Sequence, residues 1–204
     1  MKVIYYRTLI KIGKNITPEE RILYSFLVSK SITYCNDFFN SDGTTINQDI
    51  LSDSINYDHW LDMASINNTK IANELCITRQ SVINAKQSLI EKNYIKCVSD
   101  ERWFVYVNKE LLENGYFELR GKENLKGDLL IFYSFLLDKS ERFCYKATKK
   151  CDYRIDTYKD KIAEEIGKTK IAVTKLLNRL YRIGYAKRLK NGKLQLYLTP
   201  QENE

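Results

Sequence analysis

The sequence is poor in the residues from which catalytic and metal centres are usually built. It holds one histidine, His59, so no Ser-His-Asp or Cys-His arrangement can be assembled elsewhere in the chain. Its five cysteines are odd in number and include no Cys-x-x-Cys, which argues against a disulfide framework and a zinc ribbon. No glycine-rich phosphate-binding motif occurs. We therefore expect no enzyme activity, no metal, no cofactor and reduced thiols.

Long hydrophobic runs are also missing. No stretch approaches the roughly 18 apolar residues that a membrane span requires. The first residues, MKVIYYRTLIKIGK, lack an apolar core followed by a small-residue cleavage site. With 44% hydrophobic residues in 204 positions, the chain can bury one sizeable core or two small ones. We expect a soluble, cytoplasmic protein that has neither a membrane partner nor a small-molecule substrate.

A phrase of ten residues occurs twice. ILYSFLVSKS at 22–31 returns as IFYSFLLDKS at 131–140, an offset of 109, and KIANEL at 70–75 returns as KIAEEI at 161–166, an offset of 91. The fall from 109 to 91 means that the first copy holds 18 extra residues. We place them in the Asn-, Asp- and Ser-rich segment at about 35–60, as a surface loop insertion. The sequence thus predicts an internal duplication.

The first half of the repeated unit predicts two helices. Thr17 is suited to the N-cap, Pro18 to the first helical position and Glu20 to the capping box, so a helix is expected to begin here. A second, short helix is expected after the insertion, with Asn68 or Thr69 as its cap.

The second half predicts a longer helix and a hairpin. The long helix is expected to follow Thr78 and to end at Asn93, whereas its counterpart ends at Gly184, and both residue types tolerate a left-handed C-terminal conformation. Two short alternating runs around a tight turn complete each copy and predict hairpins at 94–98 with 102–107, and at 185–189 with 193–198.

Helix, short helix, turn, long helix and hairpin is the order of a winged helix-turn-helix domain. We predict a mostly α chain with small β-hairpin wings, an α+β fold of two tandem winged-helix domains at 1–107 and 108–204. The segments that carry the repeat are ITPEERILYSFL, NTKIANELCITRQSVINAKQSLIEKNYIK, LIFYSFLLDKS, DKIAEEIGKTKIAVTKLLNRLYRIGYAKR and GKLQLYLT. They resemble the N-terminal domain of plasmid and phage replication initiators of the RepA type. The resemblance implies a winged helix that binds origin DNA and commonly dimerises.

Charge separates the two copies. Residues 1–108 hold 12 Lys and Arg against 12 Asp and Glu, whereas residues 109–204 hold 21 against 14. The whole formal excess of +7 therefore lies in the second copy. Duplex DNA carries a phosphate charge about every 1.7 Å of its axis. Clustered cations bind it favourably because their binding releases counterions. We expect double-stranded DNA to be the partner of the second domain.

The long helix of the second copy, 169–183, is the predicted recognition helix. With Val173, Leu177 and Leu180 toward the core, polar and basic side chains fall on the opposite face. Residues near the start of such a helix normally reach base edges in the major groove. Thr169 and the first-turn N–H groups are instead expected to hold a phosphate. The predicted DNA-binding residues are Lys168, Thr169, Lys170, Thr174, Lys175, Asn178 and Arg182 on the helix and Lys187, Arg188, Lys190, Asn191 and Lys193 on a basic wing.

The corresponding surface of the first copy carries no such excess of cations. Its wing turn, Ser99-Asp100-Glu101, would repel phosphate. An exposed Ile83 and the aromatic strand 103–106 favour association, so this surface is either a second DNA reader or a homodimer contact through domain 1. Its residues are Arg79, Gln80, Ile83, Asn84 and Gln87.

Two other functions remain open at this stage. A transcriptional regulator would use the same DNA-binding mode at promoters rather than in an origin. A protein-interaction module, such as a phage inhibitor or adaptor, would use the same surfaces for another protein, because charged helix faces are often only solvated.

Overall fold

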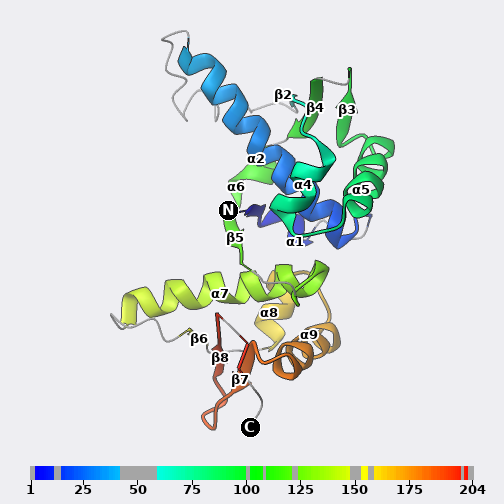
Figure 1. Ribbon diagram of the computed structural model, residues 1–204. Coiled ribbons are helices and arrows are strands. Elements are labelled where there is room, and N and C mark those ends of the chain that lie inside the picture. The colour runs from blue at the N-terminus through cyan, green and yellow to red at the C-terminus, as the bar shows by residue number, and fades with distance from the viewer. Residues whose placement is uncertain are drawn as a thin grey trace. The chain divides into compact units, whose positions relative to one another are not determined.

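The computed structural model describes residues 3–11, 15–41, 59–99, 102–107, 109–120, 124–147, 153–155, 159–198 and 200–201 (Figure 1). The chain forms two compact units, Met1–Tyr116 (unit 1) and Phe117–Glu204 (unit 2). Helices and small antiparallel sheets make up both units, which confirms the α+β class. Each unit is described separately below.

Unit 1 has two long helices and one three-stranded sheet. Its elements are β1 (Val3–Tyr6), α1 (Thr8–Lys11), α2 (Pro18–Ser41), β2 (His59–Ala64), α4 (Asn68–Leu75), α5 (Arg79–Glu91), β3 (Ile95–Cys97), β4 (Arg102–Val107) and α6 (Lys109–Glu113), and β5 (Tyr116–Leu119) begins at its last residue. The Thr8 hydroxyl donates to the carbonyl oxygen of Glu110 at 2.8 Å, and the Asn114 amide donates to Thr8 at 3.2 Å. These bonds hold α6 within unit 1, although the sequence assigns it to the second domain.

Unit 2 contains α7 (Gly127–Ala147), β6 (Arg154–Ile155), α8 (Lys159–Glu165), α9 (Lys170–Arg182), β7 (Ala186–Arg188) and β8 (Leu194–Leu196). Figure 1 shows α8, α9 and the sheet on the same side of α7, and α9 contacts both α7 and β7. The core between them is apolar. It includes Leu136, Val173, Leu180, Tyr185 and Leu194, each at most 1% exposed.

Each of the two three-stranded sheets includes one strand that the hairpin patterns do not predict. The strand orders are β2-β4-β3 and β6-β8-β7, and all neighbours are antiparallel. β2 pairs along its full length with β4, from His59 opposite Val107 to Ala64 opposite Arg102. β6 has two residues only, paired with Gln195 and Leu194. Segments of this kind are strands because a neighbouring strand pairs with them, and their own sequence gives little signal.

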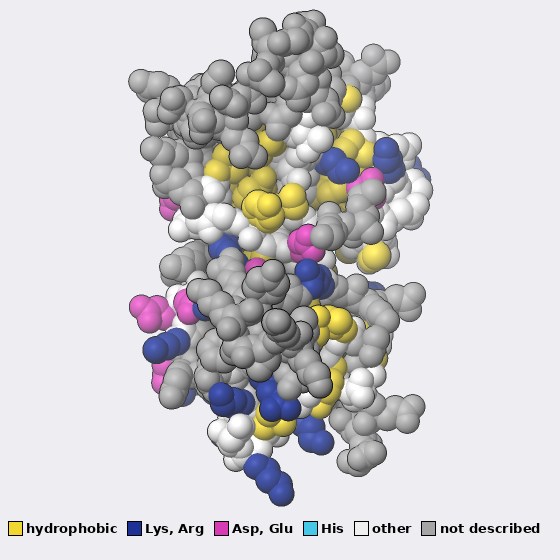
Figure 2. Space-filling view, turned by 90° about the vertical axis from the view of Figure 1, so that its left-hand side faces the viewer, with side chains coloured by type: hydrophobic (Ala, Val, Ile, Leu, Met, Phe, Trp, Pro, Cys, Tyr) yellow, Lys and Arg dark blue, Asp and Glu magenta, His cyan; other side chains and the backbone are white. Residues whose placement is uncertain are grey.

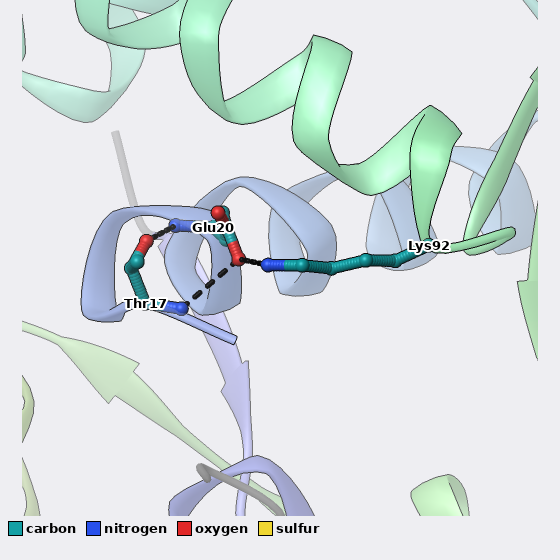
Figure 3. A network of polar contacts seen from close by, with 3 residues as sticks. All are labelled: Thr17, Glu20 and Lys92. Carbon is teal, nitrogen blue, oxygen red and sulfur yellow. Dashed lines mark hydrogen bonds and ion pairs between the residues drawn. The ribbon is translucent and has the colours of Figure 1, made fainter. Parts of the chain in front are cut away.

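The helix α2 begins where the sequence predicts but runs further. The Glu20 amide donates to the Thr17 hydroxyl oxygen at 3.2 Å, and the Thr17 amide donates to the Glu20 carboxylate at 3.0 Å, which forms a reciprocal capping box (Figure 3). α2 extends to Ser41, so the expected loop insertion does not begin at residue 35. Neither proline nor glycine occurs between Pro18 and Gly43 to end the helix. Residues 42–58 of the insertion lie outside the described part of the chain.

Two of the other predicted helix ends are confirmed, and one cap is wrong. Asn93 and Gly184 both have positive φ, +58° and +76°, directly after α5 and α9 have ended. The cap of α4, however, is Asn67 and not Asn68 or Thr69, because the Asn67 side chain accepts from the Thr69 amide at 2.8 Å. Neighbouring Asn residues are equivalent in sequence, and only the backbone path decides which one caps.

The two units repeat one another's contacts at the shifted positions. The Tyr24 hydroxyl donates to the Tyr106 carbonyl oxygen at 2.5 Å, and the Tyr133 hydroxyl donates to the Tyr197 carbonyl oxygen at 2.7 Å. The rings of Tyr24 and Tyr94 lie 5.0 Å apart between centroids, and those of Tyr133 and Tyr185 lie 5.2 Å apart.

Ion pairs recur in the same way. Lys30 pairs with Glu74 at 3.4 Å, and Lys139 pairs with Glu165. The same two lysines lie over the rings of Phe26 and Phe135. The first pair joins α2 to α4, and the second joins α7 to α8.

Candidate nucleic-acid interface

The long helix α9 is held by its apolar face. Val173, Leu176, Leu177 and Leu180 are buried, as their spacing predicts. Thr169 is the N-cap, and its side-chain oxygen accepts from the Ala172 amide at 3.2 Å. This bond occupies one of the first-turn N–H groups that were expected to hold a phosphate.

The opposite face of α9 forms a stripe at helical spacing, which we call the outer stripe of α9: Ile171, Thr174, Lys175, Asn178 and Arg182. Lys175, Asn178 and Arg182 are exposed, and Thr174 is half-buried. The Thr174 hydroxyl donates to the Lys170 carbonyl oxygen at 2.9 Å, as is usual within helices. Ile171 is 70% exposed in the middle of these polar groups.

Two predicted DNA-binding lysines are engaged with carboxylates of their own unit. The half-buried Lys168 pairs with Asp128 in the first turn of α7 at 3.0 Å. Lys170 pairs with Asp160 at the start of α8 at 2.9 Å, and both of those side chains are largely exposed. An exposed pair of this kind contributes at most about 1 kcal/mol, so it can open for a phosphate. Lys168 therefore helps to hold α7 to the turn before α9, whereas Lys170 remains accessible.

One further basic residue of this helix is exposed but is not among the predicted DNA-binding residues. Arg179 is exposed and lies one helical turn after Lys175, at the edge of the outer stripe. The i, i+4 spacing from Lys175 is the signal that could have identified it. Together with Arg182 it makes the last turn of α9 basic.

The β7–β8 hairpin presents a second group of cations. Lys187, Arg188, Lys190 and Asn191 are exposed, and Lys193 is half-buried. The Asn191 side chain accepts from the Lys193 amide at 3.1 Å, which fixes the turn. Figure 2 shows Lys and Arg side chains at the lower end of the view, where Figure 1 has this hairpin.

The hairpin and the helix influence one another electrostatically. Burial raises the pKa of the Tyr181 hydroxyl on α9, and the positive charge of Arg188 on β7 acts against that rise. The Arg188 side chain therefore lies within Coulombic reach of Tyr181 on α9.

The equivalent helix of unit 1 has a different outer surface. The exposed Gln80 amide donates to Asn84 at 2.8 Å, and the exposed Gln87 amide donates to Glu91 at 3.1 Å, so these polar groups bond to one another along the helix. Arg79 is exposed. Ile83, expected to be exposed, is half-buried, which corrects part of the case for association at this face.

The aromatic strand of unit 1 is also largely covered. Trp103 is 4% exposed, and the ammonium group of Lys86 lies 4.2 Å from its ring centroid. Lys96 covers Trp60 in the same manner at 3.8 Å. Cation–π contacts of this kind satisfy the aromatic faces within unit 1.

Within the described residues, no group of three or more His, Cys, Asp or Glu side chains is placed to hold a metal ion. None of the described helices combines the length and the apolar character that crossing a membrane would need. Comparison with protein-family models, with curated proteins and with solved structures finds no match to this chain.

Proposed function

We propose that the chain is a sequence-specific double-stranded DNA-binding protein made of two duplicated winged-helix units. In this proposal α9 enters the major groove, and the β7–β8 hairpin is the wing that contacts the phosphate backbone. Such a protein acts without enzymatic chemistry. The repeated tyrosine and lysine contacts at shifted positions support the duplication.

One observation carries the DNA-binding proposal: the exposed cations of unit 2 lie on the outer face of α9 and on the outward positions of the hairpin, away from the buried side chains of both elements. Lys175 and Arg182 extend from the face of α9 opposite Leu180, and Arg179 lies at the edge of that face. Lys187, Arg188 and Lys190 extend from the hairpin. A cationic helix of thirteen residues with a basic ribbon beside it suits the width and charge of a DNA groove.

The biological role we propose is replication initiation of the plasmid or phage type, on the strength of the sequence resemblance. A transcriptional regulator would bind DNA in the same way. The position of selected binding sites, in repeats at an origin or beside promoters, separates the two roles.

Unit 1 is proposed to support this role by association with a second copy or by a weaker DNA contact. The charged residues of α5 are Arg79 and Glu91 at its ends and Lys86, whose ammonium group lies over the Trp103 ring, so the outer face of the helix has little attraction for phosphate. Sedimentation of the DNA-free protein over a range of concentrations tests the dimer.

The experiment that tests DNA binding is a salt titration of affinity for a duplex selected from a random pool. If the cations of the protein neutralise DNA phosphates, counterions are released on binding, and the logarithm of the affinity should fall linearly with the logarithm of the salt concentration. Reversing two wing charges, Lys190→Glu with Lys193→Glu, should lower both the affinity and the steepness of this dependence. Negligible affinity for any duplex at low salt would overturn the proposal in favour of a protein-interaction module.

The matched control reverses two charges in unit 1, Arg79→Glu with Arg102→Glu. This pair changes the net charge of the whole chain equally, and both residues are exposed. It should reduce affinity less than the wing pair does. The opposite ranking would mean that unit 1 is the main DNA-binding unit.

A further inference from the structure

Ile171 is an apolar side chain where solvation alone would favour a polar one. It is 70% exposed, the highest value among the large hydrophobic side chains described as exposed. It lies nine residues before the buried Leu180, which at about 100° per residue places it on the opposite side of the helix. Its position is therefore the centre of the outer stripe of α9, and no packing within unit 2 accounts for it.

The neighbours of Ile171 on that face are polar. Thr174 and Lys175 follow at i+3 and i+4, and Asn178 at i+7, so an apolar group of four carbons is framed by a hydroxyl, an ammonium and an amide. A surface that binds another protein through apolar contacts usually has a larger continuous apolar patch than this single side chain. A major groove offers both kinds of contact, because base edges carry acceptors and donors and thymine adds its C5 methyl group.

We propose that Ile171 is a specificity-determining residue that contacts a thymine C5 methyl group in the major groove. Lys175 or Asn178 would contact a neighbouring purine in the same site. This inference rests on the proposed function, since it requires α9 to enter the groove. It adds that the recognised sequence contains a thymine selected by its methyl group and not by a hydrogen bond.

The test uses a duplex selected by the full chain, in which each thymine in turn is replaced by deoxyuridine. Deoxyuridine keeps every hydrogen-bonding group and lacks only the methyl. At one thymine of the selected site, the replacement should weaken binding by the wild-type chain about fourfold, the effect of one methyl group removed from water.

The variant Ile171→Ala should bind the thymine duplex more weakly by a similar factor and be insensitive to deoxyuridine at that same position. Alanine has the highest helix propensity, so α9 should stay folded, as far-UV circular dichroism can check. Val98→Ala is the matched control, because Val98 is 67% exposed in unit 1; it should leave both the affinity and the deoxyuridine effect unchanged.

The failures can be told apart. Tight binding of the selected duplex without a deoxyuridine effect at any position, or an effect that persists in Ile171→Ala, would overturn the methyl contact and leave DNA binding intact. A change of oligomeric state in Ile171→Ala without any deoxyuridine effect would assign the side chain to a protein contact. The absence of binding to any duplex would refute the proposed function itself.

Discussion

The hydroxyl group of Tyr24 in α2 donates a hydrogen bond to the carbonyl oxygen of Tyr106 in β4 at 2.5 Å. Tyr24 is 3% exposed, and burial, followed by the nearby tyrosines, raises the pKa of its hydroxyl well above the usual range. The group therefore stays protonated and able to donate at all ordinary pH values. Tyr133 makes the equivalent bond to Tyr197 in unit 2. In unit 1 this bond ties α2 to β4, and in unit 2 it ties α7 to the residue directly after β8.

Tyr24→Phe should destabilise unit 1 by about 1 to 2 kcal/mol, because it removes the hydroxyl group that donates to a partly buried carbonyl oxygen. Both tryptophans, Trp60 and Trp103, are in unit 1, so tryptophan fluorescence during urea unfolding follows that unit. The matched variant is Tyr133→Phe. It should leave the fluorescence transition at the same urea concentration, and it should shift the part of the far-UV circular dichroism transition that belongs to unit 2 to a lower urea concentration. Equal shifts of the fluorescence transition by both variants would contradict separate stability of the two cores.

Glu20 should make unit 1 less stable in acid. Burial alone would raise the pKa of its carboxyl, but hydrogen bonds from Lys92, Ser88 and the Thr17 amide, with the charge of Lys92 at 2.7 Å, lower it below the ordinary value (Figure 3). A carboxyl whose folded-state pKa is lowered stabilises fully above its unfolded-state value, about 4.3. This contribution is lost as the pH falls through the lower, folded-state value.

Glu20→Gln should therefore cost about 1 kcal/mol at neutral pH, and its difference from the wild type should shrink in acid. The measurement is urea unfolding, followed by tryptophan fluorescence, at several pH values. Glu19→Gln makes the same charge change one residue earlier in the same first turn and should keep the wild-type pH dependence. If the free energy of unfolding of Glu20→Gln falls with decreasing pH as steeply as that of the wild type, this network is not the source of the loss of stability in acid.

Gly184 should tolerate alanine far less well than Gly192. Both have left-handed backbones, with φ of +76° and +81°, which costs an alanine about 1 to 2 kcal/mol. A Cβ at Gly184 would also lie 2.2 Å from the backbone oxygen of Gln201, whereas a Cβ at Gly192 meets nothing within 4 Å. The Gln201 amide donates to the Gly184 carbonyl oxygen at 2.9 Å, so that contact must open.

Gly184→Ala should consequently destabilise unit 2 by at least about 1 kcal/mol more than Gly192→Ala does. Thermal unfolding followed by far-UV circular dichroism measures the difference. Equal losses in the two variants would show that the contact with Gln201 contributes nothing.

Asp160→Asn should strengthen DNA binding. The Asp160 carboxylate pairs with Lys170 at the start of α9 and competes with a phosphate for that ammonium group. Because an exposed pair is worth at most about 1 kcal/mol, the gain in affinity should reach about fivefold at most. Fluorescence anisotropy with a selected duplex at low salt gives the value.

Glu164→Gln is the control for that gain. It removes one negative charge from an exposed residue of the same helix, α8. A gain as large as that of Asp160→Asn would attribute the effect to net charge and not to the release of Lys170.

The sequence by itself determined the repeated elements. The spacing of apolar residues predicted the helices, and capping residues predicted most of their ends: Thr17 with Glu20, Thr78, Asn93 and Gly184. These signals can be found in the sequence because capping and amphipathic spacing act over a few residues. The buried face of α9 and the basic character of its exposed side could also be predicted, since the core face fixes the opposite one.

The tertiary structure decided what depends on partners distant in the chain. β2 and β6 are strands because β4 and β8 pair with them, and Lys168 and Lys170 pair with carboxylates that only the fold brings near. The partial burial of Ile83 likewise follows from packing against other elements. Local patterns do not encode such contacts, because their energies arise between segments that meet only when the chain folds.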